Sequence, residues 1–253
     1  MTDAHVFRES SPDGEGHADR ALIEAVRSGL VAAADPERAP KMQAYMKSAM
    51  PYYGVPSPVQ AQVFRAIHAA HPLPTVEAWH DTLLALWREA THREERYAAL
   101  DFAGRRSYAK YITRDALPML EEFIVTGAWW DYVDETAHLV GEVLRGDREW
   151  MTREMREWSR DPVLWKRRIS IICQLKFRAD TDLDLLYACI EANVDDREFF
   201  IRKAIGWALR QYAWTDPDEV VRYVRANAAR LSPLSKREAL KNVLKSGAIE
   251  AIP

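Results

Sequence analysis

The sequence contains little cysteine and no long hydrophobic run. Only two cysteines, Cys173 and Cys189, occur among its 253 residues, which argues against a disulfide framework and favours a reducing compartment, the cytoplasm. No apolar run approaches the roughly 18 residues that a membrane-spanning helix requires, and the N-terminus has no apolar segment typical of a secretion signal. We therefore expect neither a membrane span nor export.

Motifs for metals and nucleotides are also missing. The seven histidines are scattered, and no H-E-x-x-H or Cys/His cluster occurs. The ten glycines form no phosphate-binding loop, and both cysteines lie within apolar helical patterns typical of inert core thiols. We expect a protein without a metal, without another cofactor and without use of ATP.

Helical periodicity dominates what the sequence does contain. Residues 1–17 are polar, glycine-containing and aperiodic, which predicts a flexible leader. From Ala18 onward apolar residues recur at helical spacing, as in Leu183, Leu186 and Ile190, and Pro, Gly and Asp separate segments of ten to eighteen residues. Alternating strand patterns are essentially absent. The pattern predicts an all-α protein with residues 18–253 in one elongated domain.

A repeat runs through the second half of the chain. The segment DPVLWKRRISIICQLKF, which begins at Asp161, matches DREFFIRKAIGWALRQY, which begins at Asp196, at an offset of 35 residues. In this register Trp165 falls on Phe200, and the same spacing continued backward places Trp129 under Trp165. A period of this length is typical of stacked helical hairpins of the HEAT type. We expect a superhelical solenoid of HEAT-like repeats.

Basic residues recur at one position of the repeat, where Arg167 and Arg168 align with Arg202 and Lys203. The net charge of −3 argues against a uniformly basic nucleic-acid-binding protein but leaves a local basic face open. If the second helix of each hairpin lines a concave surface, these cations are placed to follow a polyanionic backbone. The alternative is that each ties one repeat to its neighbour through an ion pair.

The segment WWDYVD, residues 129–134, carries acid where the later repeats carry basic pairs. Trp130 and Asp134 are four residues apart, so they share one face of a helix. Trp207 lies one turn after Lys203 in its own repeat. A carboxylate among indoles and cations would be suited to chemistry, whereas the structural alternative makes the indoles core residues and the aspartates helix caps.

Several ordered stretches between about Met42 and Lys241 resemble the AlkD family of DNA alkylation-repair glycosylases. The resemblance is carried by AYMKS, YYGVPSP, LEEFIVTGAWWDYVD, LWKRRISIICQLKF, EFFIRKAIGWALRQYA and LSPLSKREALK. It implies a superhelix of HEAT-like repeats that grips duplex DNA and removes cationic N3- or N7-alkylated purines without a metal. It also implies that the damaged base does not enter a deep pocket.

The resemblance implies a role for individual residues as well. The catalytic aspartate of the family falls on Asp134, and its flanking aromatics fall on Trp130 and Trp207. The phosphate-holding arginine falls on Arg168, and the tyrosine that lines the cleft falls on Tyr45.

These residue types suit the cleavage of a glycosidic bond to a cationic base. A carboxylate such as Asp134 stabilises the oxocarbenium-like sugar and orients or deprotonates the attacking water. An alkylated purine already bears a positive charge and departs neutral, so no second carboxyl group is needed as a general acid. The faces of Trp130 and Trp207 attract cations by roughly 0.5 to 2 kcal/mol each. One carboxylate with two indoles therefore predicts a cationic lesion.

We expect a monomeric DNA glycosylase that acts on alkylated duplex DNA without a cofactor, in the cytoplasm and on the nucleoid when bound to DNA. Arg167, Arg202 and Lys203 are expected to contact phosphates beside Arg168. One departure from the family is Val59-Gln60 where relatives tend to place a basic pair, which predicts a weaker backbone contact. Two alternatives are a non-catalytic HEAT-repeat module that binds damaged or branched DNA, and a protein-interaction solenoid.

Overall fold

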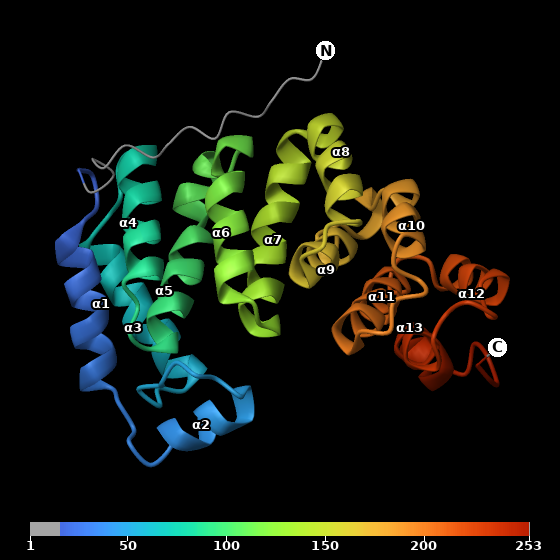
Figure 1. Cartoon of the computed structure of the whole chain (residues 1–253), viewed down its shortest axis with the longest axis horizontal. Coiled ribbons are helices and arrows are strands. Elements are labelled where there is room, and N and C mark those ends of the chain that lie inside the picture. The colour runs from blue at the N-terminus through green and yellow to red at the C-terminus, as the bar shows by residue number, and fades with distance from the viewer. Residues whose placement is uncertain (1–15, 253) are drawn as a thin grey trace. The chain divides into compact units, whose positions relative to one another are not determined.

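The computed structural model describes residues 16–252, and within them the chain forms helices and no strand (Figure 1). Most of the leader predicted over residues 1–17 lies outside the described residues. The all-α prediction is confirmed. The α-helices are α1 Arg20–Ala32, α2 Ala39–Met46, α3 Ser57–Ala70, α4 Val76–Arg88, α5 Arg93–Ala103, α6 Leu117–Gly127, α7 Trp130–Gly146, α8 Arg148–Trp158, α9 Leu164–Ile172, α10 Leu183–Glu191, α11 Phe199–Tyr212, α12 Pro217–Ala226 and α13 Pro233–Lys245. No helix of residues 16–252 is both long and apolar enough to cross a membrane.

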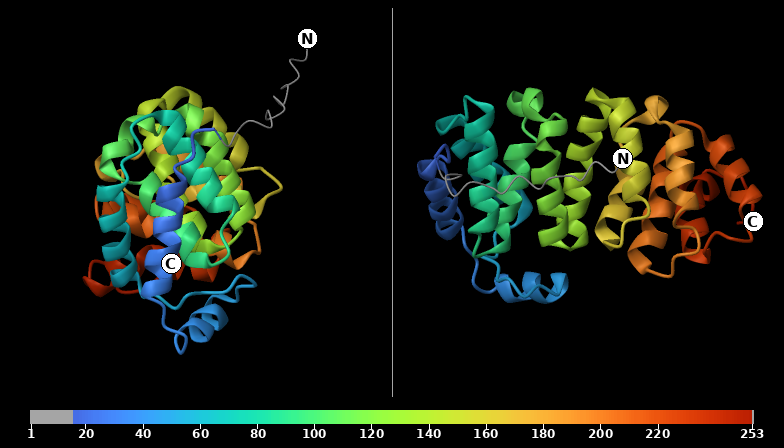
Figure 2. Two further views of the ribbon diagram at one scale, coloured as in Figure 1. Left: turned by 90° about the vertical axis from the view of Figure 1, so that its left-hand side faces the viewer. Right: turned by 45° about the horizontal axis from the view of Figure 1, so that its top comes forward.

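Contacts divide the chain into two compact units, one ending at Tyr111 and one beginning at Ile112. In the first unit, α1 packs against α3, α4 and α5, and α4 packs against α5. Helix α2 lies apart from these packed helices (Figure 1, Figure 2) and buries Met46 alone among its residues. The prediction of a single domain over residues 18–253 stays a prediction.

A buried carboxylate fixes the turn that links α2 to α3. Glu94, on α5, accepts hydrogen bonds from the backbone N–H groups of Tyr53, Gly54 and Val55 at 3.1, 2.9 and 3.2 Å. Gly54 has a φ of 87°, and a Cβ there would lie 2.1 Å from a backbone oxygen. Gln60 is buried and donates to the carbonyl of Val55 at 2.6 Å. Gln60, one of the two residues that depart from the family pattern, therefore stabilises this turn.

The second unit consists of successive hairpins, in which α7, α9, α11 and α13 contact one another in chain order. The predicted register appears directly as contacts between equivalent aromatic residues. The ring centroids of Trp129 and Trp165 lie 6.2 Å apart, those of Trp165 and Phe200 5.1 Å, and those of Trp129 and Phe200 5.6 Å. The repeat found in the sequence is thus the unit of stacking.

Two glycines allow neighbouring helices of this stack to approach closely. A Cβ at Gly141 of α7 would lie 2.4 Å from the carbonyl oxygen of Cys173, and one at Gly206 of α11 would lie 2.4 Å from Cβ of Glu238. Both cysteines are buried free thiols. Burial raises the pKa of Cys173, and it raises that of Cys189 to about 11. The two thiols are therefore protonated core residues.

Candidate functional site

The first turn of α7 carries the WWDYVD segment. Helix α6 ends at Gly127, Ala128 adopts a left-handed conformation with a φ of 43°, and Trp129 is the extended N-cap of α7. This abrupt turn directs Trp129 into the aromatic stack with α9 and α11. Trp130 and Asp134 follow on the helix, one turn apart and both half-buried.

Asp134 forms a bidentate ion pair with Arg168 of α9. Nε of Arg168 donates to Oδ1 of Asp134 at 2.8 Å, and NH2 donates to Oδ2 at 2.8 Å. The Arg168 side chain is only 4% exposed and that of Asp134 is 17% exposed. NH1 of Arg168 also donates to the backbone carbonyl of Phe200 at 2.6 Å. One guanidinium therefore joins three successive helices of the stack, α7, α9 and α11.

Burial and charge act in opposite directions on this carboxylate. Burial raises the pKa of Asp134, and the nearby charge of Asp131 adds to the rise, whereas the hydrogen bonds and charge of Arg168 lower it. Since both oxygens accept hydrogen bonds from the fork of Arg168, the paired form is the ionised carboxylate. Arg168 thus keeps the charge of Asp134 in a partly desolvated place.

Two aromatic rings lie near Arg168. The guanidinium carbon of Arg168 lies 5.9 Å from the ring centroid of Trp207 and 6.0 Å from that of Phe200. Trp207 is half-buried on α11. Three of the predicted site residues, Asp134, Arg168 and Trp207, therefore meet in one cluster, and Trp130 stands one turn from its carboxylate.

The other predicted phosphate contacts in this unit already have partners within the protein. Arg167 pairs with Asp196 at 3.1 Å, and Nε of Arg202 donates to the backbone carbonyl of Asp196 at 3.0 Å. Lys203 pairs with Glu238 of α13 at 2.7 Å. The pairs of Arg167 and Lys203 are those of the alternative interpretation, in which the basic positions tie neighbouring repeats together, whereas the contact of Arg202 lies within its own repeat. Binding of DNA by these three cations stays a prediction.

Tyr45 belongs to the other unit. It lies on α2 and is 78% exposed, one of the most exposed large side chains of the described chain. Its ring lies outside the core of this unit. Its predicted contact with DNA stays a prediction.

One half-buried titratable residue on the same helix as Asp134 was missed in the sequence. His138 lies one turn beyond Asp134 on α7 and is half-buried. Burial lowers the pKa of His138 to about 4, and the charge of Lys176 adds to the effect, so this imidazole is neutral near pH 7. The signal was the spacing of Trp130, Asp134 and His138, four residues apart each time.

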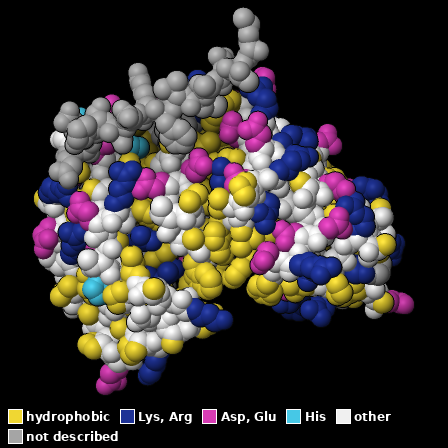
Figure 3. All heavy atoms as spheres, in the orientation of Figure 1, with side chains coloured by type: hydrophobic (Ala, Val, Ile, Leu, Met, Phe, Trp, Pro, Cys, Tyr) yellow, Lys and Arg dark blue, Asp and Glu magenta, His cyan; other side chains and the backbone are white. Residues whose placement is uncertain are grey.

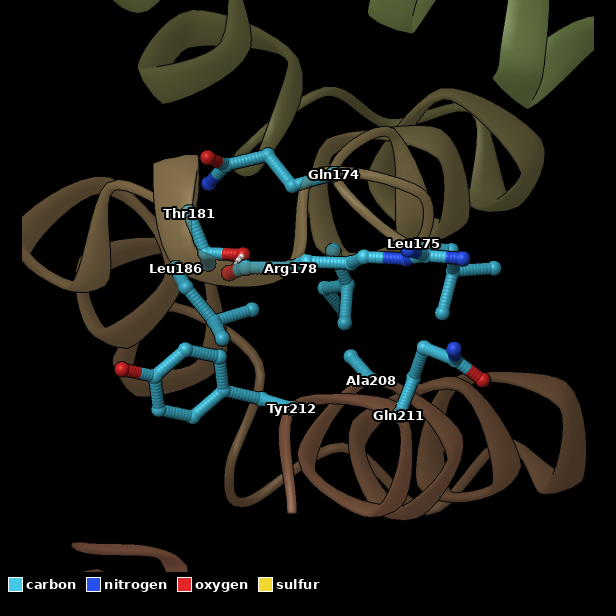
Figure 4. Close-up of a pocket in the computed structure, with 9 residues that line it drawn as sticks. Gln174, Leu175, Arg178, Thr181, Leu186, Ala208, Gln211 and Tyr212 are labelled. Atoms are coloured by element: carbon cyan, nitrogen blue, oxygen red, sulfur yellow. Dashed lines mark hydrogen bonds between the residues drawn. The ribbon is translucent and has the colours of Figure 1, made fainter. Parts of the chain in front are cut away.

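A hollow in this unit lies between α9, α10 and α11 (Figure 4). It is lined by Ile171, Gln174, Leu175, Arg178, Thr181, Leu186, Ala208, Gln211 and Tyr212. It opens near the C-terminal end of α11, whereas Phe200, which contacts Arg168, lies at the N-terminal end. The carboxylate cluster and this hollow are separate features. Among residues 16–252, no three His, Cys, Asp or Glu side chains are grouped so as to hold a metal ion.

A family model identifies the family of this chain. The sequence model described as DNA alkylation repair enzyme matches residues 26–243. A solved structure of a predicted DNA alkylation repair enzyme from Enterococcus faecalis is 29% identical with a TM-score of 0.74, and the match covers 84% of this chain and 97% of that chain.

A second solved structure shares the fold at lower identity. The alkylpurine DNA glycosylase AlkC of Pseudomonas fluorescens, bound to DNA containing an abasic site analog, is 16% identical with a TM-score of 0.52. The match covers 90% of this chain and 63% of that one. A comparison with curated proteins finds no match.

Proposed function

The chain belongs to the DNA alkylation repair enzyme family, and on that premise we propose that it is an AlkD-like DNA glycosylase. Its substrate is duplex DNA with a purine alkylated at N3 or N7, and its reaction is hydrolysis of the N-glycosidic bond. It acts as a monomer and without a cofactor. The observation that carries the proposal is the ionised carboxylate of Asp134, held by Arg168 beside the indole of Trp207.

The geometry of the ion pair leaves Asp134 able to act. A carboxylate has about four lone-pair positions, and Arg168 uses one on each oxygen. The remaining lone pairs can accept a proton of water and face a developing positive charge on the sugar. Water oxygen then bonds to C1′ as the C1′–N bond breaks. The bonding electrons neutralise the purine cation, and the proton of water passes to Asp134 or to solvent.

Arg168 has a positioning role in this scheme. Of its five N–H donors, three are used by Asp134 and the carbonyl of Phe200. The side chain is only 4% exposed, so a phosphate beside the lesion would reach the two that remain only after neighbouring side chains move. The main role of Arg168 is therefore to orient the carboxylate of Asp134. The resemblance alone implies a different main role, the holding of a phosphate.

The indoles account for lesion selectivity. Trp130 and Trp207 are both half-buried, so each offers part of a ring face to a ligand. A cation over an indole gains roughly 0.5 to 2 kcal/mol, and a neutral base such as uracil gains much less. Uracil and hypoxanthine are also poor leaving groups when no general acid protonates them. Both effects favour cationic purines.

One observation favours a second function, that of a non-catalytic DNA-binding module. Both oxygens of Asp134 are bound to Arg168, and Arg167 and Lys203 are also tied to neighbouring repeats. In that case the ion pair would only hold the repeats in register. Measurement of base release separates the two functions.

The test uses duplexes that carry 3-methyladenine, 7-methylguanine or uracil, with single-turnover release of free base at saturating protein. We expect release of the alkylpurines, no release of uracil and no effect of EDTA. Asp134→Asn is expected to lose on the order of 100-fold or more in rate. Asp196→Asn is the matched control, because Asp196 is also an inter-repeat partner of an arginine, with 19% exposure against 17%.

Unchanged release in Asp134→Asn, together with loss in a folded Asp196→Asn, would contradict the assignment of the carboxylate. Salt-dependent binding without release of any base would favour the non-catalytic module. Efficient release of uracil would contradict the lesion class.

A further inference from the structure

The last helix of the chain carries a line of cations that the site does not use. Arg237, Lys241 and Lys245 are spaced four residues apart on α13, so they share one face. All three are exposed. Within the part of the chain that the structure describes, their side chains form no hydrogen bond or ion pair. We call these three residues the basic stripe.

The basic stripe lies on the side of α13 that faces away from its packing. Ala239, Leu240 and Val243 are buried on the opposite side of the helix, since about 3.6 residues make one turn. Figure 3 shows Lys and Arg side chains gathered where α13 lies in Figure 1. The stripe is therefore available to a ligand.

The charge around the stripe is not balanced by acid. Glu238 is the acidic residue beside it, and it already accepts ion pairs from Lys203 and Arg210 of α11, both at 2.7 Å. Burial raises the pKa of Glu238, but Lys203, Arg210 and Lys241 together lower it below its usual value. One carboxylate thus stands among three cations, and the surface carries surplus positive charge.

The basic stripe differs from Arg167 and Lys203 in having no acidic partner among the described residues. Arg167 and Lys203 already have acidic partners, so a polyanion gains little from their charge. The cations of the stripe are spaced by four residues, or about 6 Å along the helix. Three exposed cations at this spacing can each contact a phosphate of a polyanionic backbone.

We propose that the basic stripe of α13 binds the phosphate backbone of duplex DNA and holds a strand while Asp134 acts on the lesion. The proposal rests on the proposed function and extends it to a binding surface. Helix α11 connects the two regions, because it carries Trp207 of the site and packs on α13 through Gly206. Contacts of this kind give affinity without base sequence preference.

The test compares two triple variants that lose the same charge. The stripe variant replaces each residue of the basic stripe with Gln. The control variant replaces three cations that already have acidic partners, Arg153, Arg222 and Arg230, with Gln. Affinity for an undamaged duplex is measured against salt concentration, and base release is measured at saturating protein. Thermal unfolding reports whether each variant is folded.

We expect the slope of log K against log salt to fall in magnitude by about 2 to 3 in the stripe variant, at roughly 0.9 per lost phosphate contact. The control variant is expected to keep the slope of the wild type. Base release at saturation is expected to persist in the control variant. An unchanged slope in the stripe variant would overturn the proposal for the basic stripe and leave the proposed function standing. A wild-type protein without salt-dependent duplex binding would overturn the stripe and the proposed function together.

Discussion

Replacing Arg168 with Met tests the ion pair on which the site depends. The change removes the guanidinium and keeps a long apolar side chain of similar reach, so it leaves the carboxylate of Asp134 without its two hydrogen bonds. The side chains of the pair are 4% and 17% exposed, so water replaces the lost bonds poorly. Breaking a buried pair in this way costs about 3 to 5 kcal/mol. We expect a loss of that size in the free energy of unfolding at pH 7.

The same variant has a defined dependence on pH. Burial already raises the pKa of Asp134 and Arg168 opposes the rise, so removal of Arg168 raises this pKa further above its unfolded value. A raised pKa contributes stability that is present at low pH and lost as the pH rises through the folded value. Acidification from pH 7 to pH 5 is therefore expected to reduce the difference in the free energy of unfolding between Arg168→Met and wild type. The reduction is up to about 1.4 kcal/mol per pH unit.

The assay is denaturant unfolding of four proteins at both pH values: wild type, Asp134→Asn, Arg168→Met and the double variant. Because Asn is neutral, the double variant is expected to be more stable than Arg168→Met at pH 7, with a coupling of about 0.5 to 3 kcal/mol. The reasoning is refuted if Arg168→Met lies within about 1 kcal/mol of wild type at pH 7. A double variant less stable than Arg168→Met would refute it equally, because Asp134 would then not be an uncompensated charge.

Two further predictions concern the packing that positions the site. Gly206→Ala places a Cβ against Glu238 and is expected to destabilise the protein by about 1 to 3 kcal/mol in denaturant unfolding. Gly146→Ala is the control, because nothing lies within 4 Å of a Cβ at that position. Equal unfolding midpoints for the two variants would contradict the close approach of α11 and α13. Cys173 and Cys189 are expected to resist a thiol reagent in the native protein and to react after unfolding, because burial raises the pKa of both thiols; fast reaction of the native protein would contradict their burial.

The helices and their stacking were predictable because they follow from periodic patterns. The spacing of apolar residues after Asp182 predicts a helix, and α10 begins at Leu183 with the carboxylate of Asp182 capping it. The alignment of Trp129, Trp165 and Phe200 in the repeat becomes a set of ring contacts, since equivalent positions of stacked hairpins face one another. Patterns of this kind depend on the chain alone.

The partners of the charged residues were not predictable in the same way. The sequence placed Arg167 and Arg168 side by side in one row, but the structure gives Arg167 the carboxylate of Asp196 in the following repeat and Arg168 that of Asp134 in the preceding one. Long side chains reach in either direction, and the choice depends on how adjacent helices are rotated. Of the unpaired cations of α13, Arg237 lies 35 residues after Arg202 and continues the basic row of the repeat, whereas Lys241 and Lys245 fall on Gly206 and Arg210 and were not selected from the sequence.

The repeat itself argues that Asp134 is present for chemistry rather than for packing. In the register of the aromatic stack, the positions equivalent to Asp134 in the next two repeats are Ser170 and Ile205, each 1% exposed. The fold therefore fills this position with a small hydroxyl residue or an aliphatic one and needs no carboxylate there. A buried ion pair is often no more stabilising than apolar residues of similar volume, so stability gives no reason to keep one. The one repeat that departs from this solution places its carboxylate beside Trp130 and, through Arg168, near Trp207. A carboxylate at a position where packing does not require one, with the indole of Trp207 close to its partner Arg168, supports the proposal that this site stabilises a positive charge.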